Sequence, residues 1–375
     1  MMRILSFFLL FLLFIGCTYK NPLEKVLSSN SEEISRVMKD PNKYEVQILF
    51  TEIERKDSQT VVFKDYEYNV DDNTYFYPAS SVKLPAAIFA LEKVVEFQDI
   101  DRHSQFQIQT DSIETNIADE VRKLLLISDN ESYNRLFEFV GKDELNQRLN
   151  ARGIKGRFTH RLSAPDSDNL ISKTIVFKTK DSSLTIPQRT NREIEPLGLR
   201  SVIKGKAFVQ GDSLVNQPKD FSKKNYMPVR SLHGIIKRLI FPDNFPKGQR
   251  FRLSLNDRLA LIKTMGLVPR DAKMDPIEYP DNYVKFLVLG DSNPEDLKPK
   301  DINIFNKVGY AYGYLIDTAY IVNDTTKKEY IITAVIHVNE NQIFNDDRYE
   351  YETIGIPFLA ELGRQLVNHS GKNKG

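Results

Sequence analysis

The strongest constraint on the fold is where the strand-like segments lie, because they occupy the two ends of the chain. Alternating apolar residues mark Tyr44–Arg55 as a half-buried strand and 60–69 as its hairpin partner. Three more strand-like segments follow near the C-terminus, at 302–314, 317–325 and 329–339. The simplest sheet joins both ends of the chain. We therefore predict an α+β fold, an α/β sandwich whose antiparallel five-stranded sheet comes from both chain ends.

Helical patterns fill the middle of the chain and form the predicted helical subdomain. Serines before Glu32 and Glu33 are typical of a helix start and predict a first helix over residues 29–39. The segment 159–225 is instead β-branched, polar and rich in turn residues, so we expect hairpins there. The remaining helical segments are Ser80 to about Ser132, 142–153, 229–241, 255–267 and a closing helix over 354–369.

Composition indicates one globular domain without a nucleic-acid-binding surface. Hydrophobic residues make up 41% of the 375 residues and charged residues 27%, which is typical of a folded chain. The 52 basic and 51 acidic residues nearly cancel, so we expect no nucleic-acid partner. We also expect a monomer. The sequence has no repeat and no Pro/Gly/Ser linker. We predict a single domain over 28–375 with an insertion at about 170–224.

The first residues are typical of an export signal. The apolar run Ile4–Ile15 is shorter than the about 20 residues of a transmembrane helix and fits the core of a signal peptide. Phe14-Ile15-Gly16-Cys17 resembles a bacterial lipobox, and Cys17 is the single cysteine. We expect a lipoprotein signal peptide over 1–16, lipidation of Cys17, a tether over 17–27 and a place in the cell envelope. The alternative is an ordinary signal peptide with a chance cysteine.

Ser80 and Lys83 form the first of three short motifs that carry chemistry. A serine hydroxyl needs a base within hydrogen-bond reach before it becomes a good nucleophile. Residues three apart share one face of a helix, so Lys83 can meet Ser80. Pro85 places Ser80 at the helix start, because proline is tolerated in the first turn. The alternative is a capping serine followed by a solvated lysine.

Each of two further motifs can also be interpreted either as a structural feature or as part of a catalytic site. Ser128-Asp129-Asn130 follows the apolar stretch "LLLI" and suits either a turn between two helices or a proton-relaying hydroxyl beside a substrate-orienting amide. Lys307-Val308-Gly309 lies on a predicted strand, where the lysine could pair with a substrate carboxylate. Taken alone, it is a lysine followed two positions later by a glycine.

The three motifs together resemble a known signature. Ser-x-x-Lys, Ser-Asp-Asn and Lys-Thr-Gly, in that order, mark class A β-lactamases and penicillin-binding proteins. The stretches "SDNESYNRLFEFVGKDELNQRLNARGIKGRFTHRL" and "NKVGYAYGYLIDTAYIV" also resemble that family. The resemblance covers roughly 44–160 and 225–369. It implies the β-lactamase-like fold predicted above.

The resemblance also implies a role for each motif residue. Ser80 would be the nucleophile that becomes acylated, Lys83 its base partner and Ser128 the proton relay. Asn130 would orient the substrate and Lys307 would attract its carboxylate. Each of these roles follows from the position of the residue within its motif.

The third motif supplies two further substrate-binding residues and one departure from the family. Gly309 and Tyr310 follow Lys307 on the strand, and the resemblance makes the backbone N–H groups of Ser80 and Tyr310 an oxyanion hole. Val308 stands where the family has Thr, so a hydroxyl that would bind a β-lactam carboxylate is absent. A hydrogen bond to a charged group contributes about 1.5–3 kcal/mol.

A second departure concerns the residue that removes the acyl group. Class A β-lactamases use a Glu in an Ω-shaped loop, and no Glu-x-x-Leu-Asn follows Ser128. Aligning Arg161-Leu162 with the family's Arg-Leu places Asp166 at that position, one methylene shorter. Asp166 could equally be a turn residue, and Asp168 is an alternative carboxylate.

The resemblance implies a serine hydrolase that forms an acyl-enzyme at Ser80. We expect hydrolysis of small β-lactams, with a D,D-peptidase-like enzyme acting on peptidoglycan peptides, or a non-catalytic binding module, as alternatives. We expect neither a cofactor nor a metal, because the five histidines are scattered without ligand spacing. They are His103, His160, His233, His337 and His369, each expected to be structural or at the surface.

Overall fold

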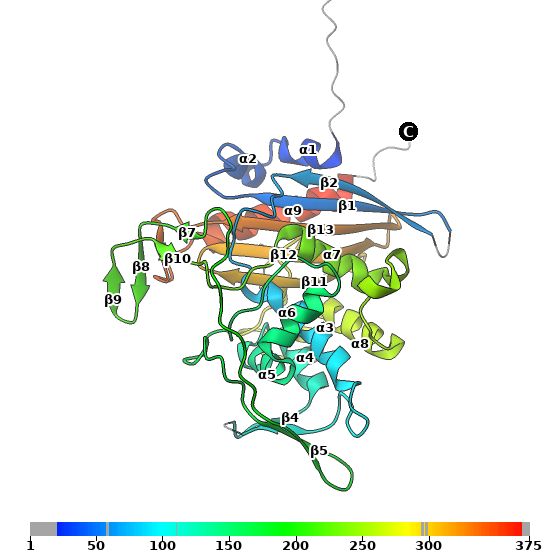
Figure 1. Ribbon diagram of the computed structural model, residues 1–375. Helices are drawn as coiled ribbons and strands as arrows, with labels where there is room; N and C mark the ends of the chain where they lie inside the picture. Colours follow the sequence, from blue (N-terminus) through cyan, green and yellow to red (C-terminus); the bar gives the residue numbers. More distant parts are fainter. Residues whose placement is uncertain (1–20, 58–59, 110, 294–295, 297–298, 370–375) are drawn as a thin grey trace, which may run out of the picture.

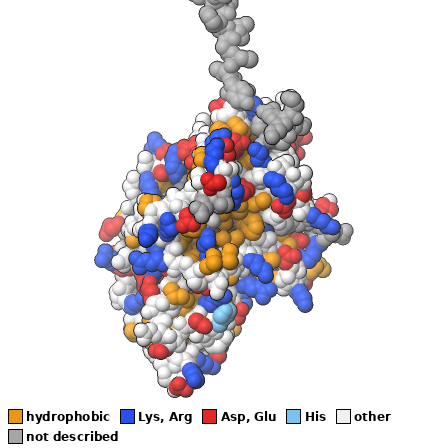
Figure 2. All heavy atoms as spheres, turned by 90° about the vertical axis from the view of Figure 1, so that its right-hand side faces the viewer, with side chains coloured by type: hydrophobic (Ala, Val, Ile, Leu, Met, Phe, Trp, Pro, Cys, Tyr) orange, Lys and Arg blue, Asp and Glu red, His pale blue; other side chains and the backbone are white. Residues whose placement is uncertain are grey.

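A computed structural model describes residues 21–57, 60–109, 111–293, 296 and 299–369 (Figure 1). The expected signal peptide and the lipidation site Cys17 lie outside the described residues. Within the described ranges, none of the helices combines the length and the apolar character needed to cross a membrane. Basic and acidic side chains are interspersed around an apolar area on the face shown in Figure 2.

The central sheet has five antiparallel strands in the order β11-β12-β13-β1-β2. The prediction that both chain ends share one sheet is confirmed. Strands β12 and β13 are buried almost throughout, whereas β2 alternates at the edge. The strands are β1 (Gln47–Arg55), β2 (Val61–Tyr68), β11 (Ile302–Ala311), β12 (Tyr314–Asn323) and β13 (Lys328–His337).

Helices cover both faces of this sheet (Figure 1). Helix α9 (Ile356–His369), with α1 (Pro22–Leu27) and α2 (Glu32–Met38) against it, covers one face. Helix α7 (Val229–Ile240) lies on the other face, next to the helical subdomain. That subdomain contains α3 (Lys83–Val94), α4 (Ile117–Leu126), α5 (Asn130–Val140), α6 (Lys142–Asn150) and α8 (Leu255–Gly266). Two buried apolar clusters result, one on each side of the sheet.

The predicted tether over 17–27 is wrong at its C-terminal end, because residues 22–27 form helix α1 of the folded domain. Asn21 caps α1, and Pro22 occupies its first turn. Leu23, Val26 and Leu27 recur at helical spacing and are buried in the cluster that contains α9. Burial of these side chains makes α1 part of the folded domain.

The insertion at about 170–224 forms strands, as expected. β5 (Ile175–Lys178) and β6 (Ser183–Ile186) join two short strands to give the order β4-β3-β5-β6. Those partners are β3 (Phe106–Ile108) and β4 (Glu114–Thr115), so the helical expectation for Ser80–Ser132 is wrong there.

The second half of the insertion lies beside the C-terminal part of the chain (Figure 1). β8 (Ala207–Gln210) pairs with β9 (Ser213–Val215) and, in parallel, with β14 (Ile343–Phe344). β7 (Ile203–Lys204) pairs with β10 (Lys219–Asp220). The insertion therefore contacts the segment 338–355 that connects β13 to α9.

Candidate active site

Ser80 lies in a tight helical turn, Ala79–Val82, that leads directly into α3. The turn begins with Ala79 in the left-handed region at φ 46°. Ser81 fixes it by donating hydrogen bonds from its backbone N–H and its hydroxyl to Pro78 O. Ser80 is half-buried and lines a cavity of about 660 Å³. The hydroxyl of Ser80 makes no hydrogen bond within the part of the chain described here, so it is free to face a substrate.

Lys83 begins α3 and is completely buried. Its Nζ donates to Asn130 Oδ1 at 2.8 Å, to the Ser128 carbonyl and to Ser128 Oγ at 3.4 Å. Burial lowers the pKa of Lys83 well below its usual range, and the nearby charge of Lys307 lowers it further, against a weaker opposing effect of Asp129. A neutral lysine amine can accept a proton, as the assignment of Lys83 as base requires.

Ser128 links the two buried lysines. It stands in the left-handed region at φ 54°, in the turn between α4 and α5, where Asp129 caps α5. Its Oγ accepts from Lys307 Nζ at 2.9 Å as well as from Lys83. Because both bonds are donated by lysines, the Ser128 hydroxyl proton can be directed elsewhere, including toward a leaving group.

Lys307 reaches this cluster from β11. Its side chain is buried, and its Nζ also donates to Val308 O at 2.7 Å. Burial lowers the pKa of Lys307 to about 7, and the carboxylate of Asp317 opposes this shift. The Lys307 amine is therefore mostly protonated below about neutral pH and increasingly neutral above it.

Gly309 lets β11 come into contact with the turn that carries Ser80. A Cβ at this position would lie 2.7 Å from Ser81 N and 2.9 Å from Ser80 N. Real Cβ atoms do not approach so closely, so a side chain here would push the strand away. Tyr310 follows on the same strand, lines the cavity and is 41% exposed.

Val308 points into the core. It is buried in the apolar cluster on the α9 side, together with Ile304 and Leu315, and it is not among the residues that line the cavity.

The structure does not bring Asp166 into the cavity. Its side chain is 38% exposed and lies 3.4 Å from Lys173 Nζ. Asp168 is more exposed still and lies 3.6 Å from Lys224 Nζ. Neither is among the cavity-lining residues. The alignment that placed Asp166 beside the nucleophile is therefore not supported by its position.

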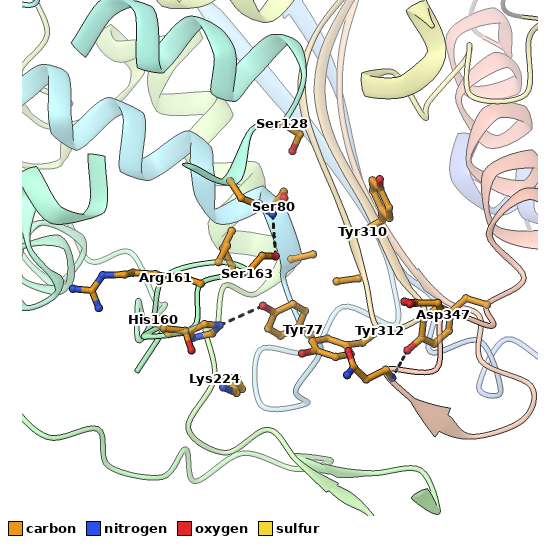
Figure 3. Close-up of a pocket in the computed structure, with 18 of the residues that line it drawn as sticks. Tyr77, Ser80, Ser128, His160, Arg161, Ser163, Lys224, Tyr310, Tyr312 and Asp347 are labelled. Atoms are coloured by element: carbon orange, nitrogen blue, oxygen red, sulfur yellow. Dashed lines mark hydrogen bonds between the residues drawn. The ribbon is translucent and has the colours of Figure 1, made fainter. Parts of the chain in front are cut away.

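From the same loop, Ser163 lines the cavity and Asp166 does not. Ser163 accepts a hydrogen bond from Asn130 Nδ2 at 3.0 Å (Figure 3). The buried ion pair of Arg161 with Glu138 anchors the loop that carries Ser163. Asn134 fixes the next residue by pairing with both backbone groups of Leu162. These contacts direct Ser163 toward Asn130, which itself binds Lys83, and leave Asp166 facing Lys173.

Sequence reasoning missed the outer wall of the cavity. Part of it comes from the segment 338–355, which contributes Asn345, Asp347, Tyr349 and Tyr351. Tyr77, Tyr283 and Tyr312 also line the cavity, and each comes from a different part of the chain. The clustered tyrosines and aspartates of "NDDRYEYE" were the available signal, but their spacing matches no motif.

His160 also lines the cavity, although it was expected to be structural or at the surface. It is buried, its Nδ1 lies 2.6 Å from Thr159 Oγ1, and its Nε2 lies 3.4 Å from Tyr77 OH. Burial lowers its pKa to about 3, and the charge of Lys224 contributes. The imidazole is therefore neutral at physiological pH and supports the wall.

Comparison with known proteins supports this fold. Residues 30–191 match the model of a family described as the Beta-lactamase enzyme family. A search of curated proteins finds no match.

Two solved structures share the architecture at low sequence identity. A β-lactamase from Sphaerobacter thermophilus is 13% identical, with a TM-score of 0.51 over 94% of this chain and 98% of that one. A β-lactamase from Xanthomonas campestris is also 13% identical, with a TM-score of 0.50 over 92% of this chain and 99% of that one. The chain therefore has a β-lactamase-like fold.

Proposed function

We propose that this protein is a serine hydrolase of the type shared by class A β-lactamases and penicillin-binding proteins, and that it forms an acyl-enzyme at Ser80. The observation that carries the proposal is the hydrogen-bonded series Lys83–Ser128–Lys307 beside an unpaired serine hydroxyl. A buried lysine with a lowered pKa provides the base that a serine nucleophile needs. Burying two lysine amines costs free energy, and supplying a base for Ser80 gives that cost a catalytic purpose which a non-catalytic binding module would lack.

The reaction would begin when Ser80 Oγ attacks a substrate carbonyl and Lys83 accepts the hydroxyl proton. The backbone N–H groups of Ser80 and Tyr310 would stabilise the tetrahedral oxyanion. Ser128 would then donate its proton to the departing nitrogen and recover one from Lys83, with which it shares a hydrogen bond. Lys307, when charged, would attract the substrate carboxylate. The carbonyl carbon–nitrogen bond breaks as the ester bond to Ser80 forms.

Removal of the acyl group is the slower step in this proposal. Within the described residues, Asp347 is the carboxylate that lines the cavity, and Figure 3 shows it across the cavity from Ser80. A water molecule beside the ester would lack a carboxylate base. We therefore favour a penicillin-binding, peptidase-like enzyme that acts on acyl-D-amino acid peptides and is trapped by β-lactams.

Rapid β-lactam hydrolysis is the second candidate. The observation in its favour is the lowered pKa of Lys83, because a neutral amine can also activate water.

We further propose, from the sequence alone, that the chain is exported, anchored through a lipid on Cys17 and monomeric.

Intact-mass measurement during incubation with benzylpenicillin tests the proposal. We expect an adduct that accumulates on the wild-type protein and persists for minutes or longer, and none on Ser80→Ala. Rapid turnover with only a transient adduct would favour the β-lactamase. An adduct on Ser80→Ala would refute the nucleophile assignment. If benzylpenicillin and acyl-D-alanyl-D-alanine peptides both leave the wild-type protein unmodified and unhydrolysed, the proposed activity is wrong.

A further inference from the structure

The catalytic cavity has two chemically different sides. The inner side is lined by Ser80 and Ser128. Behind Ser128 lie the buried amines of Lys83 and Lys307, and Lys307, when charged, suits an anionic group. The outer side carries the carboxylate of Asp347 among tyrosine rings. Figure 3 shows Tyr310, Tyr312 and Asp347 across the opening from Ser80 and Ser163. When Lys307 is charged, the two sides of the cavity therefore differ in the sign of their charge.

Asp347 differs from the charged side chains Lys224 and Arg161 at the cavity surface because it has no hydrogen-bond or ion-pair partner in the described residues. Lys224 lies 3.6 Å from Asp168, and Arg161 is paired with Glu138 in the interior. Asp347 is exposed and takes part in no ion pair or hydrogen bond among the residues described. An unpaired carboxylate facing a cavity is free to bind a cation from solution.

Tyrosines line the same part of the cavity as Asp347, and their rings are held in place. Tyr351 OH accepts from Gly313 N at 2.8 Å, and Tyr349 OH accepts from Asn345 N at 2.6 Å. The rings of Tyr349 and Tyr351 lie 5.2 Å apart, and Tyr351 meets Tyr310 edge to face at 5.7 Å. Aromatic faces attract ammonium groups. The wall therefore offers π-surfaces beside a carboxylate.

The backbone fixes this arrangement from both sides. Asn345 and Asp347 lie in the left-handed region, at φ 63° and 57°. β14, just before them, pairs with β8 of the insertion, and Asn345 Nδ2 donates to Val209 O at 3.0 Å. The insertion thus supports the segment that presents Asp347.

We propose that Asp347, with the rings of Tyr349 and Tyr351, forms a subsite for a positively charged ammonium group on the acyl part of the substrate. This inference rests on the proposed function, because it extends the same cavity. The preferred substrate would be zwitterionic. Its carboxylate would lie toward Lys307 and its ammonium group toward Asp347, with the reactive carbonyl at Ser80 between them.

Matched penicillins test this subsite. Each probe carries a free amine on its acyl side chain, either at the α-carbon, as in ampicillin, or at the end of a longer linear chain. Its control is the same molecule with that amine acetylated. The second-order rate constant for Ser80 acylation is measured by intact mass. In the wild-type protein we expect at least one free amine to react about threefold to tenfold faster than its acetylated form, as for a partly exposed charge pair beside an aromatic ring.

The variants Asp347→Asn and Asp347→Lys separate the subsite from general charge. The preference for the free amine should disappear in the first and reverse in the second. Asp212→Asn, which removes an exposed carboxylate from the nearby β8–β9 turn, should retain it. A preference that is absent from the wild-type protein, or unchanged in Asp347→Asn, would overturn the inference while leaving the proposed function intact.

A binding measurement covers the case in which no penicillin acylates Ser80. That result would argue against the proposed function rather than against the subsite. Calorimetric binding of acyl-D-alanyl-D-alanine peptides with free or acetylated amines would then compare the wild-type protein with Asp347→Asn. Tighter binding of the free amine in the wild-type protein alone would support the subsite, and equal or absent binding would overturn it.

Discussion

The inner and outer halves of the cavity are built in different ways. Lys83 and Lys307 are buried side chains on a helix and a central-sheet strand. Asp347 and Tyr310 are exposed, and Asp347 comes from an irregular segment with left-handed backbone. Rigid elements fix the reacting groups, whereas loops present the groups that contact variable parts of a substrate. We therefore expect changes in the inner half to affect the rate for every substrate and changes in the outer half to affect selectivity.

The largest effect is expected from Gly309→Ala, which should disturb the inner half without removing any reacting group. The new methyl group would overlap backbone atoms of Ser80 and Ser81, so β11 must move away from the turn. A shift of about 1 Å at a reacting centre can cost about a hundredfold in rate. Overpacking of this kind also destabilises a core by about 1–3 kcal/mol. Acylation kinetics and chemical denaturation measure the two effects.

Gly198→Ala is the matched control for that change. Gly198 has open space around its Cβ position, so the substitution should leave both measurements nearly unchanged. If the Gly309→Ala variant were acylated at the wild-type rate, the contact between β11 and the Ser80 turn would not be needed for the reaction.

A second prediction concerns pH and sharpens the role of Lys307. Its pKa of about 7 means that the cation is present below pH 7 and is lost as the pH rises. The acylation rate constant at low substrate concentration reports the free enzyme. For a penicillin carboxylate it should fall above pH 7 by up to about tenfold per pH unit.

The corresponding methyl ester provides the control, because it lacks the carboxylate that Lys307 would attract. Its rate should rise with pH as Lys83 loses its proton and should then show no decline near pH 7. Parallel profiles for the acid and the ester, after correction for spontaneous hydrolysis, would contradict the assigned role of Lys307.

The sequence predicted the inner half well and the outer half poorly, for physical reasons. Ser80 and Lys83 are three apart at a helix start, a local relation that the chain itself fixes. Lys307 and Gly309 lie in the strand-like segment 302–314, so their element was also predictable. Asp347 and Ser163 depend on tertiary contacts of loops, and no local period encodes those. The misplaced Asp166 has the same origin, because Arg161 and its partners decide which loop residue faces inward.

A third prediction introduces a carboxylate where the inner half lacks one. Ser163 lines the cavity and contacts Asn130, which itself binds Lys83. Ser163→Asp suits the backbone, because Asp tolerates the left-handed conformation observed at φ 51°. The new carboxylate would activate water, and we expect the acyl-enzyme lifetime to fall by about tenfold, less than the about hundredfold low end of general-base effects.

The same substitution should slow acylation. A carboxylate near Lys83 would raise the pKa of the lysine and reduce the fraction of neutral base at pH 7. Pre-steady-state mass measurements separate the two steps. Ser163→Asn, which adds no charge, is the control, and equal lifetimes for the two variants would show that a base at this position does not promote deacylation.

The smallest effect is expected from Asp166→Asn, and it tests the structure against the sequence alignment. Asp166 is turned toward Lys173 and away from the cavity. Losing an exposed ion pair lowers the free energy of unfolding by about 0–1 kcal/mol. The rates of acylation and deacylation should both stay within about twofold of the wild type. A marked increase in acyl-enzyme lifetime would instead mean that the loop rearranges on acylation and brings Asp166 to the ester. In that case Ser163→Asp and Asp166→Asn should have opposite effects on lifetime, because one variant adds and the other removes a carboxylate near the same carbon atom.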